Sequence, residues 1–305
     1  MKKLLIIGGS GFLGKSFIDY ATSKTFVKWK INELILLSRR KINFKFKKNK
    51  KIKIKFIRGD ISKIKKIPKT EYIIYAANSQ TYKSNLKGIR NFSFLIKKIP
   101  IKTKILFTSS GAVYGNIGKI KKIGEQEKLK FKKILGLSKN KRDYAKSKIK
   151  IEKIFKSFAN KKYNISIARM FTFFGKRILS DRSYAISDFI HSATYKGKIV
   201  VNSSHPVYRS YMHSNDMVNW LISILTSSSK KCPIYNVGSD KEISIKNLAE
   251  LISKIFKKPI LLNKSKNKKI DCYVPSVKKA KNKLGLKINY NLENLIKSII
   301  KNKHV

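Results

Sequence analysis

The fold is decided close to the start of the chain, by the stretch LLIIGGSGFLG that runs from Leu4 to Gly14. Its four apolar residues predict a short buried strand, and the residues from Phe12 to about Ser23 predict a helix after the glycines. Gly9, Gly11 and Gly14 satisfy the spacing G-x-G-x-x-G between strand and helix. In such a turn, glycines allow a tight bend, a close approach to a pyrophosphate and close packing of the helix on the strand. The stretch therefore predicts a phosphate-binding loop.

Strands and helices alternate through the rest of the first half. The further strands that we expect are Leu34–Leu37, Lys51–Ile57, Tyr72–Ala76, Lys104–Phe107 and Ile165–Met170. Later segments have the spacing of amphipathic helices, at Trp220–Thr226 and Ile245–Phe256. Alternation of this kind predicts an α/β fold with a doubly wound parallel sheet.

The net charge is extreme. Lys and Arg number 71 and Asp and Glu 16, so the formal charge is 71 − 16 = +55 over 305 residues. A surplus of this size often indicates a nucleic acid or an anionic membrane as partner. Here the lysines are spread along the whole chain and accompany many isoleucines and asparagines, all of which have AT-rich codons. We therefore favour compositional drift, with dedicated polyanion binding as the alternative.

Other features exclude several classes of protein. No apolar run approaches the 18 residues of a membrane-spanning helix, so membrane insertion is not expected. The basic and then apolar start lacks the small-residue cleavage site of a signal peptide. Cys232 and Cys272 form no disulfide pattern, which fits a reducing, cytoplasmic location. The four histidines show no metal-ligand spacing, so we expect no metal site.

The end of the second strand indicates which dinucleotide binds. Sites for NAD place Asp or Glu there for the ribose 2′-hydroxyl, whereas an Arg nearby accommodates the 2′-phosphate of NADP. In this chain the strand ends in Ser38, Arg39 and Arg40, without a carboxylate. NADP is therefore favoured, and NAD remains the alternative. Asp60 follows the third strand, where it is placed to touch the adenine end of either cofactor.

Three residues form a candidate catalytic group. Tyr144 and Lys148 are four residues apart and so share one helix face. Ser110 ends the fifth strand, at the sheet edge where ligands bind in such folds. A phenolate base at pH 7 requires a tyrosine pKa about three units below its ordinary value, and a neighbouring ammonium acts in that direction. The group predicts hydride transfer at a carbinol carbon, with Ser110 bonded to the substrate oxygen.

The sequence resembles the extended short-chain dehydrogenase/reductases of the NAD-dependent epimerase/dehydratase family, which act on nucleotide sugars. The resemblance runs over nearly the whole chain. It is carried by the glycine loop, Gly59-Asp60, Tyr75-Ala76-Ala77, Asn85-x-x-Gly88-x-x-Asn91, Ser109–Gly115, Tyr144, Lys148, Glu152, Arg169–Gly175, Arg209–Asp216, Asn236–Ser239, Tyr273-Val274-Pro275 and Leu284-Gly285.

This resemblance implies a Rossmann domain over residues 1–168, to which a stretch near 205–240 returns, and a smaller α/β substrate domain mainly over 169–305. By matching position, Ser110, Tyr144 and Lys148 are catalytic, and Ser110, Thr172 and Arg209 contact the substrate. The expected cofactor contacts are Gly8, Gly11, Phe12, Leu13, Gly14, Ser38, Arg39, Arg40, Asp60, Ile61, Ala76, Ala77, Tyr144 and Lys148.

Two positions depart from the family pattern. Thr172 stands where an asparagine is common, which puts its substrate contact in doubt. The family's hexose dehydratases carry an acid pair directly after the catalytic Ser or Thr, whereas this chain has Gly111 and Ala112. We therefore expect an NAD(P)-dependent nucleotide-sugar epimerase or 4-ketoreductase. The alternatives are a 4,6-dehydratase and a non-catalytic nucleotide- or RNA-binding module. Family analogy also suggests a homodimer, and the nucleotide and sugar stay open.

Overall fold

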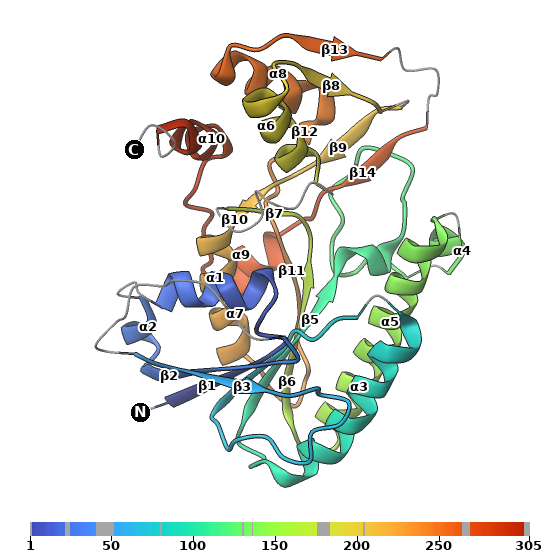
Figure 1. Cartoon of the computed structure of the whole chain (residues 1–305). Helices are drawn as coiled ribbons and strands as arrows, with labels where there is room; N and C mark the ends of the chain where they lie inside the picture. The colour runs from blue at the N-terminus through green and yellow to red at the C-terminus, as the bar shows by residue number, and fades with distance from the viewer. Residues whose placement is uncertain are drawn as a thin grey trace. The chain divides into compact units, whose positions relative to one another are not determined.

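The computed structural model describes residues 2–21, 25–40, 52–79, 81–129, 131–135, 137–175, 184–203, 205–263 and 269–301 (Figure 1). The chain divides into two compact units. The first comprises Met1–Gly115, Lys128–Met170 and Val218–Val237. The second comprises Asn116–Glu127, Phe171–Met217 and Gly238–Val305.

The first unit is built on a seven-stranded sheet in the order β11-β6-β5-β4-β1-β2-β3. Every neighbouring pair in this sheet is parallel, which confirms the doubly wound α/β fold. All six predicted strands are present, although Lys51 lies outside the described residues. The strands are β1 (Lys2–Ile7), β2 (Ile31–Ser38), β3 (Lys53–Arg58), β4 (Tyr72–Tyr75), β5 (Lys104–Ser110), β6 (Asn164–Met170) and β11 (Ile234–Val237).

Helices cover both faces of this sheet. In Figure 1, α3 (Tyr82–Leu95) and α5 (Lys139–Asn160) lie on one face and α1 (Phe12–Ala21) on the other. Helix α1 begins at Phe12 as predicted, and residues 22–24 lie outside the described chain. The shorter helices are α2 (Thr25–Lys28), η1 (Ile96–Lys98), η2 (Gly111–Tyr114) and α4 (Phe131–Leu135), and α7 (Ser214–Thr226) enters this unit at Val218.

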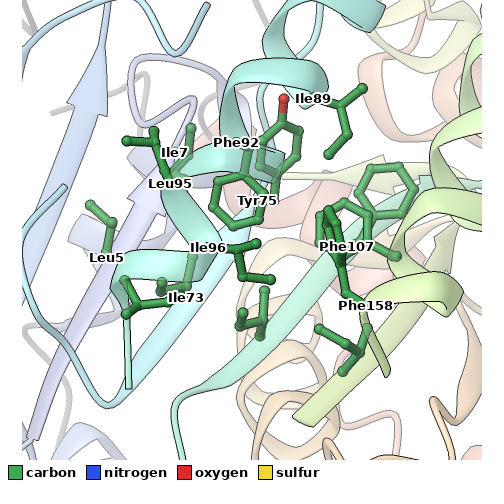
Figure 2. Packing of buried hydrophobic residues seen from close by; sticks show 14 of the residues in the cluster. Leu5, Ile7, Ile73, Tyr75, Ile89, Phe92, Leu95, Ile96, Phe107 and Phe158 are labelled. Atoms are coloured by element: carbon green, nitrogen blue, oxygen red, sulfur yellow. The ribbon is translucent and has the colours of Figure 1, made fainter. Parts of the chain in front are cut away.

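An aromatic core fixes α3 and α5 to the sheet. Figure 2 shows Tyr75 of β4 beside Phe92 of α3, with a ring-centre distance of 5.0 Å. Phe107 of β5 stacks on Phe155 of α5 at 4.7 Å with an interplanar angle of 6°. Apart from Tyr75, at 2%, these rings have no solvent exposure. Burying such large rings stabilises the fold strongly, and the core therefore holds the ends of β4 and β5 in place.

The second unit combines short strand pairs with helices. Strand β7 (Phe173–Phe174) pairs with β10 (Met212–His213), β8 (Ile199–Val201) with β13 (Ile260–Leu262), and β9 (Val207–Arg209) with both β12 (Ile243–Ser244) and β14 (Asp271–Tyr273). Helix α8 (Ile245–Phe256) has the bounds predicted for it and packs against α6 (Ala185–Tyr195). The remaining helices are α9 (Lys278–Leu284) and α10 (Leu292–Lys301).

Within the described ranges, no helix is both long and apolar enough to span a bilayer. The same residues contain no group of three or more His, Cys, Asp or Glu side chains that could hold a metal ion. Cys232 and Cys272 are both buried and free.

Candidate active site

The glycine loop follows β1 in a conformation that needs glycine for two reasons within the chain itself. Gly8 has a φ of +99°, in the left-handed region, and a Cβ there would lie 2.8 Å from the carbonyl carbon of Ala76. A Cβ on Gly14 would lie 2.1 Å from the carbonyl oxygen of Gly9. The backbone N–H groups of Gly8 and Gly9 both donate to Leu37 O, at 2.8 and 3.0 Å. These contacts fix the loop against β2.

Gly11 differs from Gly8 and Gly14. A Cβ on Gly11 would meet only Gly8 O, at an ordinary 3.6 Å. The packing of the described chain therefore does not require a glycine there. Because Gly11 lines the cavity described next, a bare backbone at this point leaves room for a ligand to approach closely. The loop thus fits a dinucleotide pyrophosphate bound at the start of α1.

A cavity of about 670 Å³ opens at the carboxyl ends of β1, β2 and β4. Nine of the predicted cofactor contacts line it, namely Gly8, Gly11, Ser38, Arg39, Arg40, Asp60, Ile61, Ala76 and Ala77. Five others are not among the lining residues, namely Phe12, Leu13, Gly14, Tyr144 and Lys148. The cavity also includes residues that were not predicted from the sequence, among them Ser10, Ser62, Lys63, Asn78, Ser79 and Lys87.

One end of the cavity carries several charges. Arg39 and Arg40 are exposed there, and the Ser38 hydroxyl donates a 2.6 Å hydrogen bond to the carbonyl oxygen of Arg40. Burial acts to raise the pKa of Asp60, but hydrogen bonds from Ser62 and the charges of Arg39 and Lys63 outweigh it and hold that pKa below its ordinary value. This end of the cavity therefore carries three cationic side chains around one ionised carboxylate.

Helix α3 anchors two of the loops that form the cavity. Asn85 Oδ1 accepts from Ser79 N at 2.7 Å, and its Nδ2 donates to Ser79 O at 3.0 Å. Asn91 Nδ2 donates to the carbonyl oxygens of Ile61 and Ile64, each at 2.8 Å. The two asparagines of the Asn85-x-x-Gly88-x-x-Asn91 motif thus tie the loops after β4 and β3 to one helix.

Lys148 is buried at the end of β5, with 3% of its surface exposed. Its Nζ donates a 3.0 Å hydrogen bond to Thr108 O and lies 5.5 Å from the centre of the Tyr144 ring. Burial lowers the pKa of Lys148 to about 8, and the charge of Glu152 opposes this shift only in part. At pH 7 Lys148 is therefore still mainly in its charged ammonium form.

Ser110 is the last residue of β5 and also the N-cap of η2. Its Oγ accepts a 3.2 Å hydrogen bond from Ala112 N, and only 6% of the residue is exposed. Helix α5, which carries Tyr144 and Lys148, packs against both β5 and η2. The structure therefore brings all three predicted catalytic residues into the first unit, around one strand end.

The predicted substrate residues Thr172 and Arg209 belong to the second unit. Arg209 Nη2 forms a 2.8 Å ion pair with Asp271 Oδ2, and its Nη1 donates to Tyr208 O at 2.9 Å. Thr172 is buried, and its carbonyl oxygen accepts from Met212 N at 3.1 Å. The partner Asp271 could not be predicted from the sequence, because it lies 62 positions along the chain and reaches Arg209 only through the pairing of β9 with β14.

Comparisons with known proteins identify the family. Residues 4–238 match the NAD dependent epimerase/dehydratase family, and the chain belongs to it. UDP-glucuronic acid decarboxylase 6 from Arabidopsis thaliana is 24% identical over 309 residues, covering 93% of this chain and 83% of the relative.

Two solved structures have the same fold. One is the dTDP-glucose 4,6-dehydratase of Bacillus anthracis in complex with NAD, with 17% identity, a TM-score of 0.76, and coverage of 99% of this chain and 96% of that one. The other is the UDP-N-acetylglucosamine 4-epimerase of Methanobrevibacter ruminantium in complex with UDP-N-acetylmuramic acid, with 19% identity, a TM-score of 0.74, and coverage of 98% and 97%. The protein is thus an enzyme of a family whose members differ in reaction.

Proposed function

We propose that this enzyme is an NAD(P)-dependent nucleotide-sugar 4-epimerase or 4-ketoreductase that uses Ser110, Tyr144 and Lys148. The observation that carries the proposal is the buried Lys148 ammonium, which is held by Thr108 O beside the Tyr144 ring. Burying a lysine in this way costs free energy, since the charged form loses its hydration, and an acid–base role accounts for that cost. A cation placed beside a tyrosine at the sheet edge fits a proton-transfer site.

The nicotinamide cofactor, when bound, supplies the hydride acceptor and donor. Tyr144 Oη takes the proton from the sugar hydroxyl during oxidation and returns one during reduction. Lys148 favours the phenolate by its charge, and the Thr108 carbonyl keeps its Nζ in place. The Ser110 hydroxyl donates a hydrogen bond to the same substrate oxygen, where negative charge develops.

For the cofactor, we propose a preference for NADP over NAD. The support is the set of Arg39, Arg40 and Lys63 around the end of the cavity at β2. A 2′-phosphate there gains contacts with guanidinium groups, which suit bidentate phosphate binding. Asp60 reduces the positive charge at this end but does not cancel it, since three cationic side chains stand against one carboxylate.

In the second unit, we propose that Arg209 contacts the substrate phosphates. Its guanidinium is already paired with Asp271, so a diphosphate has to share it or displace the carboxylate. Sharing is feasible because a guanidinium has five N–H donors.

Two other reactions are alternatives for this enzyme, namely decarboxylation of a sugar acid and 4,6-dehydration. The decarboxylase relatives favour UDP-glucuronic acid as a trial substrate. Oxidation at C4 turns this sugar into a β-keto acid, which loses CO₂ readily, and the resulting enolate takes a proton at C5 that water can supply. A 4,6-dehydratase, in contrast, has to protonate a leaving hydroxyl and abstract a C5 proton. Gly111 and Ala112 offer no group for either step, so this reaction would need Glu125, Glu127 or Asp143.

The deciding experiment is a panel of nucleotide sugars, screened with NADP and NAD for thermal stabilisation and then for product. A ligand present at about 100 times its dissociation constant adds about 2.7 kcal/mol of stability. We expect 4-epimers or 4-reduced sugars, and Tyr144→Phe should bind the same ligands with turnover lowered at least about 100-fold. Released CO₂ from UDP-glucuronic acid would assign the decarboxylase reaction instead. A 4-keto-6-deoxy product would assign the dehydratase reaction, and binding without any turnover would favour the non-catalytic module.

A further inference from the structure

A network of buried polar side chains joins α5 to β5 and β6. Glu152 Oε1 accepts from Ser109 Oγ at 2.6 Å and from Arg169 Nε at 3.0 Å, and Oε2 accepts from Arg169 Nη2 at 2.8 Å. Arg169 Nη1 donates to the Tyr114 hydroxyl at 2.9 Å, which donates to Asn236 Oδ1 at 2.9 Å. None of these residues is more than 3% exposed.

Stability alone explains such a network poorly. Removing two charges from water costs several kcal/mol per ion, and replacing a buried pair by apolar residues is often neutral or stabilising. Arg169 keeps its charge here: burial acts to lower its pKa, but Glu152 and Tyr114 outweigh this and raise it. The Arg169 cation therefore stays in the core of the first unit, where it is paired with Glu152 at 2.8 Å.

The network meets the active site on both sides of Ser110. Ser109, which donates to Glu152, lies directly before Ser110 on β5. Tyr114, which accepts from Arg169, lies in η2, the turn that Ser110 caps. One helical turn before Glu152 on α5, Lys148 donates to Thr108 O. Two hydrogen bonds, one turn apart, thus fasten α5 to the end of β5.

We propose that Glu152 and Arg169 form a positioning pair, which fixes the main chain around Ser110 and sets the charge that faces Lys148. This proposal rests on the proposed function for what Ser110 and Lys148 do. Neither residue of the pair acts on substrate itself. Glu152 acts through Ser109 and Lys148, and Arg169 acts through Glu152 and Tyr114.

The pKa of Lys148 depends on the charged groups around it. Burial lowers the pKa of Lys148 to about 8, and Glu152 raises it. Helix α5 packs against α3, α4, β5, β6 and η2. Besides the pair itself, these elements carry the following titratable or charged residues. Helix α3 has the half-buried Tyr82 and the exposed Lys83, Lys87 and Arg90, and α4 has Lys132 and the half-buried Lys133. Tyr114 belongs to η2, and Lys104 lies at the opposite end of β5 from Lys148.

Substituting the two members of the pair should shift the pKa of Lys148 in opposite directions. Glu152→Gln removes the nearby negative charge and leaves the Arg169 cation uncompensated, so Lys148 should lose its proton at lower pH. Arg169→Met leaves the carboxylate uncompensated beside Lys148, so Lys148 should hold its proton to higher pH. Loss of structure alone would give no such opposition in sign.

The experiment follows the ¹⁵N shift of Lys148 Nζ against pH, with the resonance identified by its absence in Lys148→Met. We expect the midpoint to fall by about one pH unit in Glu152→Gln and to rise in Arg169→Met. Glu250→Gln is the matched control, since Glu250 pairs with Lys246 on the exposed face of α8, and it should shift nothing. Unchanged midpoints, or shifts in the same direction, overturn the proposal.

Kinetics supply the second readout. Both substitutions should lower kcat about 10- to 100-fold with little change in the KM for the cofactor, because a misplaced catalytic group loses rate without losing ligand contacts. If a charge variant does not fold, Ser109→Ala removes one hydrogen bond of the network and Tyr114→Phe removes two, and both variants keep the two charges. Each should lower kcat several-fold, and unchanged kcat in both overturns the proposal.

The titration separates this proposal from the proposed function, because it needs no turnover. A wild-type enzyme that converts no nucleotide sugar would end the proposed function. The ¹⁵N midpoints of Glu152→Gln and Arg169→Met would still decide whether the pair sets the charge state of Lys148.

Discussion

The Nζ atom of Lys148 lies 5.5 Å from the centre of the Tyr144 ring, one turn away on the same helix. The same atom lies 5.1 Å from the Phe107 ring and bonds to Thr108 O at 3.0 Å. The ammonium is therefore held between β5 and the tyrosine, almost fully shielded from bulk water. Its charge acts on the tyrosine with little solvent screening, since an ion pair or dipole interaction strengthens in a low-dielectric interior.

Tyr144→Phe should remove the acid–base group and keep the ring packing. We expect turnover to fall about 100- to 10,000-fold, the usual effect of losing a positioned proton-transfer group. Cofactor binding should persist, because the cavity that we assign to the dinucleotide does not include Tyr144 among its lining residues. Tyr195→Phe is the control, since Tyr195 is 70% exposed on α6. Full activity in Tyr144→Phe would remove this residue from the mechanism.

Lys148→Met should lose rate at neutral pH and recover part of it at high pH. Without the ammonium, the phenolate forms only when the solution itself is alkaline enough. The wild-type rate should instead fall at high pH. Burial lowers the pKa of Lys148 to about 8, so activity should decline above that pH as the ammonium is lost. Rate profiles of both proteins from pH 6 to 10 check this. Parallel profiles would show that the lysine charge is irrelevant to the rate.

Stability should depend on pH through the same residue. In the folded state Lys148 loses its proton near pH 8, whereas in the unfolded chain it does so near 10.5. Between these values the unfolded state binds more protons, so the free energy of unfolding should rise with pH there. The gain is at most about 3 kcal/mol, since each pKa unit corresponds to 1.36 kcal/mol. Denaturation of wild type and Lys148→Met side by side isolates this effect from the other lysines, and an equal pH dependence would contradict it.

Local patterns in the sequence predicted most of the sheet, but β11 was not among the predicted strands. Its four residues, Ile234–Val237, include a fully buried asparagine, Asn236, which breaks the apolar run by which the other buried strands were recognised. That asparagine is tolerated because its amide oxygen accepts from the Tyr114 hydroxyl, 122 positions away. No local pattern reveals a partner so distant.

In the candidate site, too, local patterns could be predicted from the sequence, whereas contacts between distant residues could not. The glycine spacing and the Tyr144–Lys148 spacing are local, so the sequence was sufficient to propose them. The roles of Asn85 and Asn91 were not predicted, since they depend on where the loops after β4 and β3 meet α3. The pairing of Arg209 with Asp271 was also not predicted, because strand register between β9 and β14 cannot be read from either segment alone.

Arg39→Gln and Arg40→Gln should each weaken NADP more than NAD. Both guanidinium groups lie at the cavity end where the sequence predicts the ribose 2′-phosphate, and contacts of this kind are ionic. The wild-type preference for NADP should accordingly shrink as salt is raised, since exposed charges are screened. Arg90→Gln is the control, because Arg90 is exposed on α3 and is not among the lining residues. Titrations of both cofactors at two ionic strengths measure this, and tighter NAD in the wild type would contradict the preference.

Gly11→Ala and Gly14→Ala should separate ligand binding from folding. A Cβ on Gly14 would lie 2.1 Å from Gly9 O, so the loop has to move, and we expect a loss of about 1–3 kcal/mol in the free energy of unfolding. A Cβ on Gly11 meets Gly8 O at 3.6 Å, so the fold should keep its stability. The added methyl would instead occupy the place where a pyrophosphate approaches the backbone. We therefore expect Gly11→Ala to melt like the wild type and to bind either dinucleotide at least about 10-fold more weakly, which costs 1.4 kcal/mol of binding. Melting curves and cofactor titrations on the two variants check this. Wild-type cofactor affinity in a folded Gly11→Ala protein would show that the bare backbone at Gly11 serves no ligand.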